Sequence, residues 1–103
     1  LFSMERILAL QKEGHPIQPG TTGENLTIQG LDWGLMKIGA KFLIGEVEIE
    51  LTGPAPPCKT ISESFDGEGF VRISEKKHPG WSRWYASVNK EGFISKNDEI
   101  LKL

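Results

Sequence analysis

The single cysteine of the chain, Cys58, lies in the segment LTGPAPPCKT (residues 51–60), behind a proline-rich stretch and directly before a lysine. Pro56 and Pro57 favour an extended backbone, so they predict a short helix that begins at Cys58 or Lys59. The unpaired amides at a helix start and the Lys59 cation would both lower the thiol pKa from about 8.5 toward neutrality. The segment therefore predicts a reactive thiolate, and the alternative is a buried cysteine that acts as a small hydrophobe.

Composition limits the classes of protein that this chain can represent. Its 103 residues fit one domain, which we expect to span residues 1–103. The net charge of −2 opposes general binding to nucleic acid or to an anionic membrane. One cysteine cannot form an internal disulfide, and no apolar run of about 20 residues is present. We therefore expect a cytoplasmic protein.

A period-two pattern gives the clearest secondary-structure prediction. Val47, Ile49 and Leu51 alternate with glutamates, which indicates a strand with one buried face and one wet face. A turn at Gly45-Glu46 would pair this strand with residues 41–44 in a hairpin.

The other expected elements are short and are separated by turn residues. A helix should begin at Ser3 as N-cap and end at Gly14. Further short strands are predicted at residues 25–29, 70–73, 81–88, 93–95 and 99–103, with a helical turn after Asp32 and a short helix over residues 59–65. Many short strands with a few small helices favour a mainly β fold, an antiparallel β-barrel or rolled sheet.

Four strings in the sequence resemble one known family. They read PGTTGENLTIQGLDWGLMKIGAKFLIG, LTGPAPPCKTI, HPGWSRWYASV and EGFISKNDEI. Together they resemble the C-terminal two-thirds of a MOSC domain, the module named after the C-terminus of molybdenum cofactor sulfurase, and in particular its small stand-alone bacterial versions. The Gly23–Leu26 motif GENL and the Pro57-Cys58 pair occur in the family's order and at about its separation.

The resemblance implies both a fold and a chemistry. The fold would be an antiparallel β-barrel similar to the pyruvate-kinase barrel. The chemistry would use one essential cysteine, here Cys58, which either carries sulfur as a persulfide or binds molybdenum in the pterin of the molybdenum cofactor (molybdopterin). A soft, accessible thiolate suits both roles. The implied partners are a cysteine desulfurase, which would link the protein to a pyridoxal phosphate pathway, or a molybdoenzyme.

Five further residues are candidates for the cofactor or substrate site. Glu24 and Asn25 match the family's loop motif, for which we infer positioning of the site rather than proton transfer. Asn25, Thr52 and Arg83 are expected to line the pocket, and Lys59 is expected to bind the cofactor beside the thiol. Thr52 and Arg83 come from predicted strands, and Lys59 is adjacent to the thiol in sequence.

Arg83 also belongs to an aromatic pattern. Alternation along residues 81–88 would place it on one face with Trp81 and Tyr85. Such a flat, cationic patch could bind a phosphate and stack on a pterin or nucleobase. Cross-strand aromatic packing with a solvated arginine is the simpler alternative.

The chain also departs from the family pattern. Typical MOSC domains carry an upstream glycine-aspartate-arginine stretch and a histidine-glycine motif, and this sequence begins after that region. The resemblance therefore implies an incomplete barrel with exposed strand edges, a partial pocket and self-association into a homo-oligomer as a hypothesis. The rival function is a truncated, non-catalytic module that binds a partner or oligomerises, with Cys58 inert. A thiol redox sensor would need a second thiol from another molecule.

Overall fold

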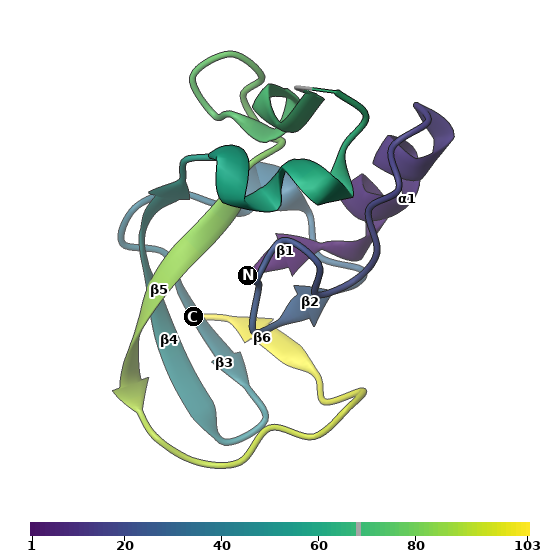
Figure 1. Cartoon of the computed structure of the whole chain (residues 1–103). Helices are drawn as coiled ribbons and strands as arrows, with labels where there is room; N and C mark the ends of the chain where they lie inside the picture. The colour runs from purple at the N-terminus through teal and green to yellow at the C-terminus, as the bar shows by residue number, and fades with distance from the viewer. Residues whose placement is uncertain (68) are drawn as a thin grey trace.

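A small parallel sheet and one helix form the N-terminal part of the chain. The computed structural model describes residues 1–67 and 69–103 (Figure 1). Strand β1 (Phe2–Ser3) leads directly into helix α1 (Met4–Lys12) and pairs in parallel with β2 (Thr27–Ile28). Ser3 caps the helix by accepting a hydrogen bond from the Arg6 backbone N–H at 3.2 Å, which confirms the predicted helix start.

The larger sheet has four antiparallel strands in the order β5-β4-β3-β6. Its strands are β3 (Lys41–Ile44), β4 (Val47–Ala55), β5 (Arg83–Lys90) and β6 (Ile100–Lys102). Ile44 pairs with Val47 across the Gly45-Glu46 turn, which confirms the predicted hairpin. Val47, Ile49 and Leu51 are buried as their alternation predicts.

The fold is mainly β with short helices, as predicted, but the antiparallel barrel that was expected in incomplete form is an open sheet. A barrel closes when its first and last strands pair. Here β5 pairs with β4 and β6 pairs with β3, so within residues 1–67 and 69–103 the two outer strands remain edges and no closed barrel forms. Figure 1 shows the two separate sheets.

Three short 3₁₀ helices connect these elements: η1 (Trp33–Leu35), η2 (Lys59–Ser64) and η3 (Gly69–Ile73). Asp32 caps η1 as predicted, because its carboxylate accepts from the Gly34 N–H at 2.9 Å. None of the helices in the described ranges has the length and apolar character needed to span a membrane.

Two predicted strands are wrong. Residues 70–73 lie in η3, where Phe70 and Ile73 are three residues apart and the more buried positions, a spacing that suits a 3₁₀ turn. Residues 93–95 form no strand. Phe93 instead exchanges hydrogen bonds with Glu46 at the hairpin turn, its N–H with the carboxylate at 3.1 Å and its carbonyl with the Glu46 N–H at 3.2 Å.

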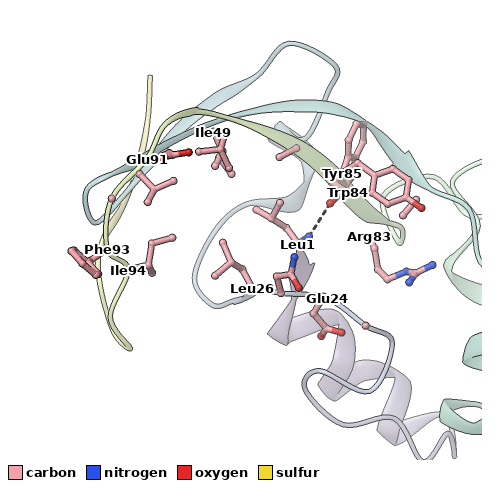
Figure 2. Close-up of a pocket in the computed structure, with 17 residues that line it drawn as sticks. Leu1, Glu24, Leu26, Ile49, Arg83, Trp84, Tyr85, Glu91, Phe93 and Ile94 are labelled. Atoms are coloured by element: carbon pink, nitrogen blue, oxygen red, sulfur yellow. Dashed lines mark hydrogen bonds between the residues drawn. The ribbon is translucent and has the colours of Figure 1, made fainter.

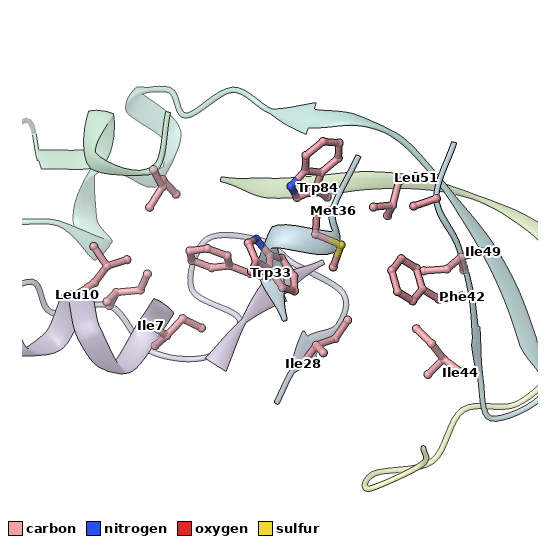
Figure 3. Close-up of a cluster of buried hydrophobic side chains, with 14 of the residues drawn as sticks. Ile7, Leu10, Ile28, Trp33, Met36, Phe42, Ile44, Ile49, Leu51 and Trp84 are labelled. Atoms are coloured by element: carbon pink, nitrogen blue, oxygen red, sulfur yellow. The ribbon is translucent and has the colours of Figure 1, made fainter. Parts of the chain in front are cut away.

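The hydrophobic core lies between the larger sheet and the N-terminal elements (Figure 3). Phe42 and Ile49 project from the sheet toward Trp33, which is 4% exposed. The Trp33 indole N–H donates to the Ser82 carbonyl at 2.8 Å, so its polar atom is satisfied inside the core. Ile7 and Leu10 of α1 are fully buried at the end of the core that lies away from the larger sheet. This packing fixes β5 against the N-terminal elements.

The hairpin turn predicts a glycine requirement at position 45. Gly45 has a φ of +56°, and a Cβ there would collide with the Asp98 carboxylate and approach the Phe93 carbonyl to 3.0 Å. We expect Gly45→Ala to lower the free energy of unfolding by about 1–3 kcal/mol in denaturant titration. Gly53→Ala is the matched control, because a Cβ on Gly53 meets no atom within 4 Å. Equal effects of the two substitutions would contradict this account.

Candidate functional site

Cys58 is exposed on the segment that joins β4 to η2. Its backbone is extended, with φ −145° and ψ 175°, as the preceding prolines predict. The exposure excludes the alternative of a buried cysteine that acts as a small hydrophobe. The thiol can therefore meet a reagent or a partner from solvent. We call residues 56–60 the cysteine loop.

The pKa of the Cys58 thiol is lowered from its ordinary value, chiefly by Thr60. The Cys58 Sγ and Thr60 Oγ1 atoms lie 2.7 Å apart, and hydrogen bonds from the Thr60 hydroxyl and backbone N–H favour the thiolate. Desolvation of the thiol opposes this effect, and the positive charge of Arg83 adds the smallest lowering of the pKa.

The short helix predicted to begin at Cys58 or Lys59 is the 3₁₀ helix η2, with Cys58 as its N-cap. The Thr60 backbone N–H, which helps to lower the thiol pKa, is one of the amides at this helix start, as the sequence predicted. Lys59 is exposed and is not among the groups that lower the thiol pKa; the cation that does so, with the smallest effect, is Arg83 from a distant strand.

Removal of the Thr60 hydroxyl should raise the thiol pKa. We expect Thr60→Val to slow iodoacetamide alkylation of Cys58 at neutral pH by about two- to tenfold, the range of one hydrogen bond. The pH midpoint of the reaction should move upward, because a lowered pKa means that more thiolate is present at neutral pH in the native protein. Thr60→Ser keeps the hydroxyl and should retain most of the rate. An unchanged midpoint in Thr60→Val would remove Thr60 from the site.

Glu24 organises a second loop, residues 20–27, which we call the glutamate loop. Its carboxylate accepts hydrogen bonds from the Gly20 N–H at 3.0 Å, the Thr22 hydroxyl at 2.7 Å and the Thr27 hydroxyl at 3.1 Å. These bonds tie both ends of the loop to one side chain, which suits a positioning role. Asn25, in contrast, presents an exposed side chain at the loop surface.

Arg83 contacts both loops from the first residue of β5. Its Nη1 donates to the Thr22 carbonyl at 2.6 Å and its Nη2 donates to the Pro56 carbonyl at 3.2 Å. Ala55 is the strand partner of Arg83, so the sheet register delivers the guanidinium group next to the cysteine loop. Arg83 thus links the residues that directly precede the two motifs that the sequence pointed out, GENL and Pro57-Cys58.

A pocket of about 890 Å³ opens beside the glutamate loop and the buried face of the sheet (Figure 2). Its polar lining includes Glu24, Asn25 and Arg83 at one end. Its apolar lining is given by Leu1, Leu26, Val47, Ile49, Ala55, Trp84, Ala86, Val88, Phe93 and Ile94. Leu1 and Trp84, which both belong to this lining, exchange backbone hydrogen bonds of 2.8 and 2.9 Å.

The predicted site residues fall into two groups. Glu24, Asn25 and Arg83 line the pocket, whereas Cys58 and Lys59 lie on the exposed cysteine loop outside its lining. Thr52 is also outside the lining, exposed at a bulge in the β4–β5 ladder. Arg83 is the residue common to both groups, because it lines the pocket and its charge reaches the thiol.

The predicted flat patch of Trp81, Arg83 and Tyr85 does not form along one strand. β5 begins at Arg83, so Trp81 precedes it. The Trp81 ring contacts two other guanidinium groups, those of Arg6 at 4.7 Å and Arg72 at 3.9 Å from its centroid. These cation–π contacts attach the segment before β5 to α1 and η3.

Sequence reasoning missed Thr60 and the carbonyl of Thr22. A hydroxyl two residues after a thiol can reach the sulfur within a tight turn, so the C-x-T spacing was a usable signal for Thr60. The Thr22 carbonyl carries no such signal, because every residue has a carbonyl and its direction depends on the fold of the loop.

Comparison with known proteins gives the family. The family model for the MOSC domain matches residues 1–101. The chain belongs to the MOSC domain family. The uncharacterized protein YflK of Bacillus subtilis (strain 168) is 29% identical over 80 residues, which cover 78% of this chain and 35% of YflK.

Solved structures agree on the MOSC fold. The crystal structure of YiiM from Geobacillus stearothermophilus matches with a TM-score of 0.78 at 21% identity, covering 99% of this chain and 52% of that one. YiiM from Escherichia coli matches with a TM-score of 0.75 at 24% identity and the same coverage. This MOSC chain therefore spans about half the length of these structural relatives.

MOSC domains are associated with the molybdenum cofactor. Among residues 1–67 and 69–103, no three His, Cys, Asp or Glu side chains gather as a metal site. Cys58 would thus hold the metal alone, and the organic part of the cofactor would need a cavity that the thiol lines. The pocket of about 890 Å³ is not lined by Cys58. The described residues do not fit the complete cofactor.

Proposed function

We propose that this MOSC domain is a sulfur carrier that holds sulfur as a persulfide on Cys58. The observation that carries the proposal is an exposed thiol whose pKa is lowered by Thr60 and Arg83. Sulfur carriers need a nucleophilic thiolate that a partner can reach on both the loading and the unloading step. The open position of the cysteine loop meets that need better than it meets the needs of a buried metal ligand.

The chemistry balances without an added oxidant. The Cys58 thiolate attacks the terminal sulfur of a donor persulfide, a new S–S bond forms at Cys58, and the donor's S–S bond breaks. The donor thiolate leaves with the electron pair. A cysteine desulfurase, which presents its sulfur as an enzyme persulfide, is the proposed donor. The chain has one cysteine, so unloading must use a nucleophile from another molecule.

The rival function, a non-catalytic binding or oligomerisation module with an inert cysteine, gives no reason for the Thr60 hydrogen bond or for solvent exposure of the thiol. The open edges of β5 and β6 do agree with self-association. The two functions are separated by the reactivity of the thiol rather than by the oligomeric state.

The test measures alkylation of Cys58 against pH and, on unalkylated reduced protein, treatment with a small persulfide donor such as cysteine persulfide. We expect a reaction midpoint below the ordinary thiol value of about 8.5. Intact mass should then increase by one sulfur atom, and dithiothreitol should remove it. A midpoint at or above the ordinary value, without a sulfur adduct, would support the inert module instead.

A further inference from the structure

We propose that Arg83 is a positioning residue whose guanidinium group clamps the cysteine loop to the glutamate loop. The inference rests on the proposed function, since a clamp of this kind serves a thiol that reacts. It assigns Arg83 a task different from the phosphate grip expected from its sequence. Arg83 touches neither a reacting sulfur atom nor a ligand in this role, but it decides where the thiol is held.

The geometry of the clamp depends on a planar fork. Two different nitrogens of Arg83 donate to two carbonyls, Nη1 to Thr22 at 2.6 Å and Nη2 to Pro56 at 3.2 Å. The two acceptors belong to loops that are far apart in sequence. Arginine presents its donors in a fixed plane, whereas a lysine ammonium is a single point with rotating donors. A lysine at position 83 could keep the charge but could not span both carbonyls in the same way.

The sheet supplies the base of the clamp. Arg83 pairs with Ala55 in the β4–β5 ladder, so the acceptor Pro56 is the next residue along the chain. Trp84, the residue after Arg83, is 7% exposed and exchanges backbone hydrogen bonds with Leu1. The start of β5 is therefore held on both sides, and the Arg83 stem leaves from a fixed point.

The orientation of Arg83 gives up one of its own hydrogen bonds. Its Nε is buried and, within the described residues, has no acceptor. Across residues 1–67 and 69–103, Arg83 also forms no ion pair with a carboxylate within 4.0 Å. An arginine placed for solvation would leave its donors in water. Arg83 instead donates to two loop carbonyls, while its buried Nε has no acceptor among the described residues.

A second contact joins the glutamate loop to η2, the helix that follows the cysteine loop. Ser64 of η2 is 5% exposed, and its hydroxyl donates to the Thr21 hydroxyl oxygen at 2.8 Å. Glu24 holds the rest of the glutamate loop. These hydrogen bonds hold the glutamate loop in place, and Arg83 connects the cysteine loop to it. The clamp also keeps a positive charge near the thiol, in agreement with the effect of Arg83 on its pKa.

The experiment compares Arg83→Lys and Arg83→Gln with the wild-type chain. Lys90→Gln is the matched control, because it removes one positive charge from an exposed position on the same strand. Hydrogen exchange measured by mass spectrometry reports both loops, and the pH profile of Cys58 alkylation reports the thiol. Thermal unfolding confirms that each variant is folded. If Arg83→Gln does not fold, Arg83→Lys decides alone.

We expect both Arg83 variants to speed amide exchange in both loops together by roughly tenfold, as two charge-assisted bonds are lost or weakened. The alkylation midpoint should rise in both, while Lys90→Gln behaves as the wild type. Wild-type behaviour of Arg83→Lys, or a change confined to one loop, would overturn the clamp. A wild-type thiol that fails to react would overturn the proposed function, while the exchange of the two loops would still decide the role of Arg83.

Discussion

Cys58→Ser is expected to abolish sulfur loading of the protein completely. The chain has no other cysteine, and a serine hydroxyl neither ionises near neutral pH nor forms a persulfide. Intact mass after treatment with a persulfide donor should show no added sulfur. Because Cys58 is exposed, the free energy of unfolding should stay within about 0.5 kcal/mol of the wild type. Function and stability would thus separate in one variant.

A relocated thiol provides the matched control. Glu63 is exposed on η2, so Cys58→Ser combined with Glu63→Cys keeps one accessible cysteine on the neighbouring helix. That cysteine lacks the Thr60 hydrogen bond and should behave as an ordinary thiol, with only a few per cent thiolate, roughly 3%, at neutral pH. Loading should therefore be slower than in the wild type. Equal loading of the relocated and native thiols would mean that exposure alone explains the reaction, and the special surroundings of Cys58 would have no part in it.

The elements that the sequence predicted well are those in which local pattern and tertiary packing agree. The β3–β4 hairpin combines strict alternation with a glycine turn, and both its register and its buried face are as predicted. The helix from Met4 combines a serine N-cap with an apolar stripe that meets the core. Phe70 to Ile73 lacked such agreement, because four residues fit a strand and a 3₁₀ turn equally well. Closure of the sheet could not be predicted from local sequence patterns, because it depends on whether strands that are distant in sequence pair at their edges.

The candidate site divides in the same way. The exposed thiol behind its prolines and the loop motif at Glu24 were visible as residue types at particular positions. The environment of the thiol was visible only in part: Thr60, which lowers its pKa most, lies two residues along the chain, whereas the smaller effect of Arg83 depends on the β4–β5 register. The sequence favoured Lys59 since it is adjacent to Cys58. Adjacent side chains in an extended segment point apart, whereas the side chain of Thr60, two residues on, contacts the sulfur.

Phe42→Ala should destabilise the protein more than any other substitution discussed above. Phe42 is 1% exposed on β3 and packs in the core, so its truncation leaves a cavity and should lower the free energy of unfolding by about 3–5 kcal/mol. Phe93→Ala is the matched control, because the same side chain is 83% exposed there and its loss should change that free energy by about 0.5 kcal/mol or less. Urea unfolding followed by circular dichroism measures both. Since Phe93 was predicted to lie in a strand, a cost at Phe93 that approaches the cost at Phe42 would show that its side chain is packed in solution, and the exposed position of Phe93 would then be wrong.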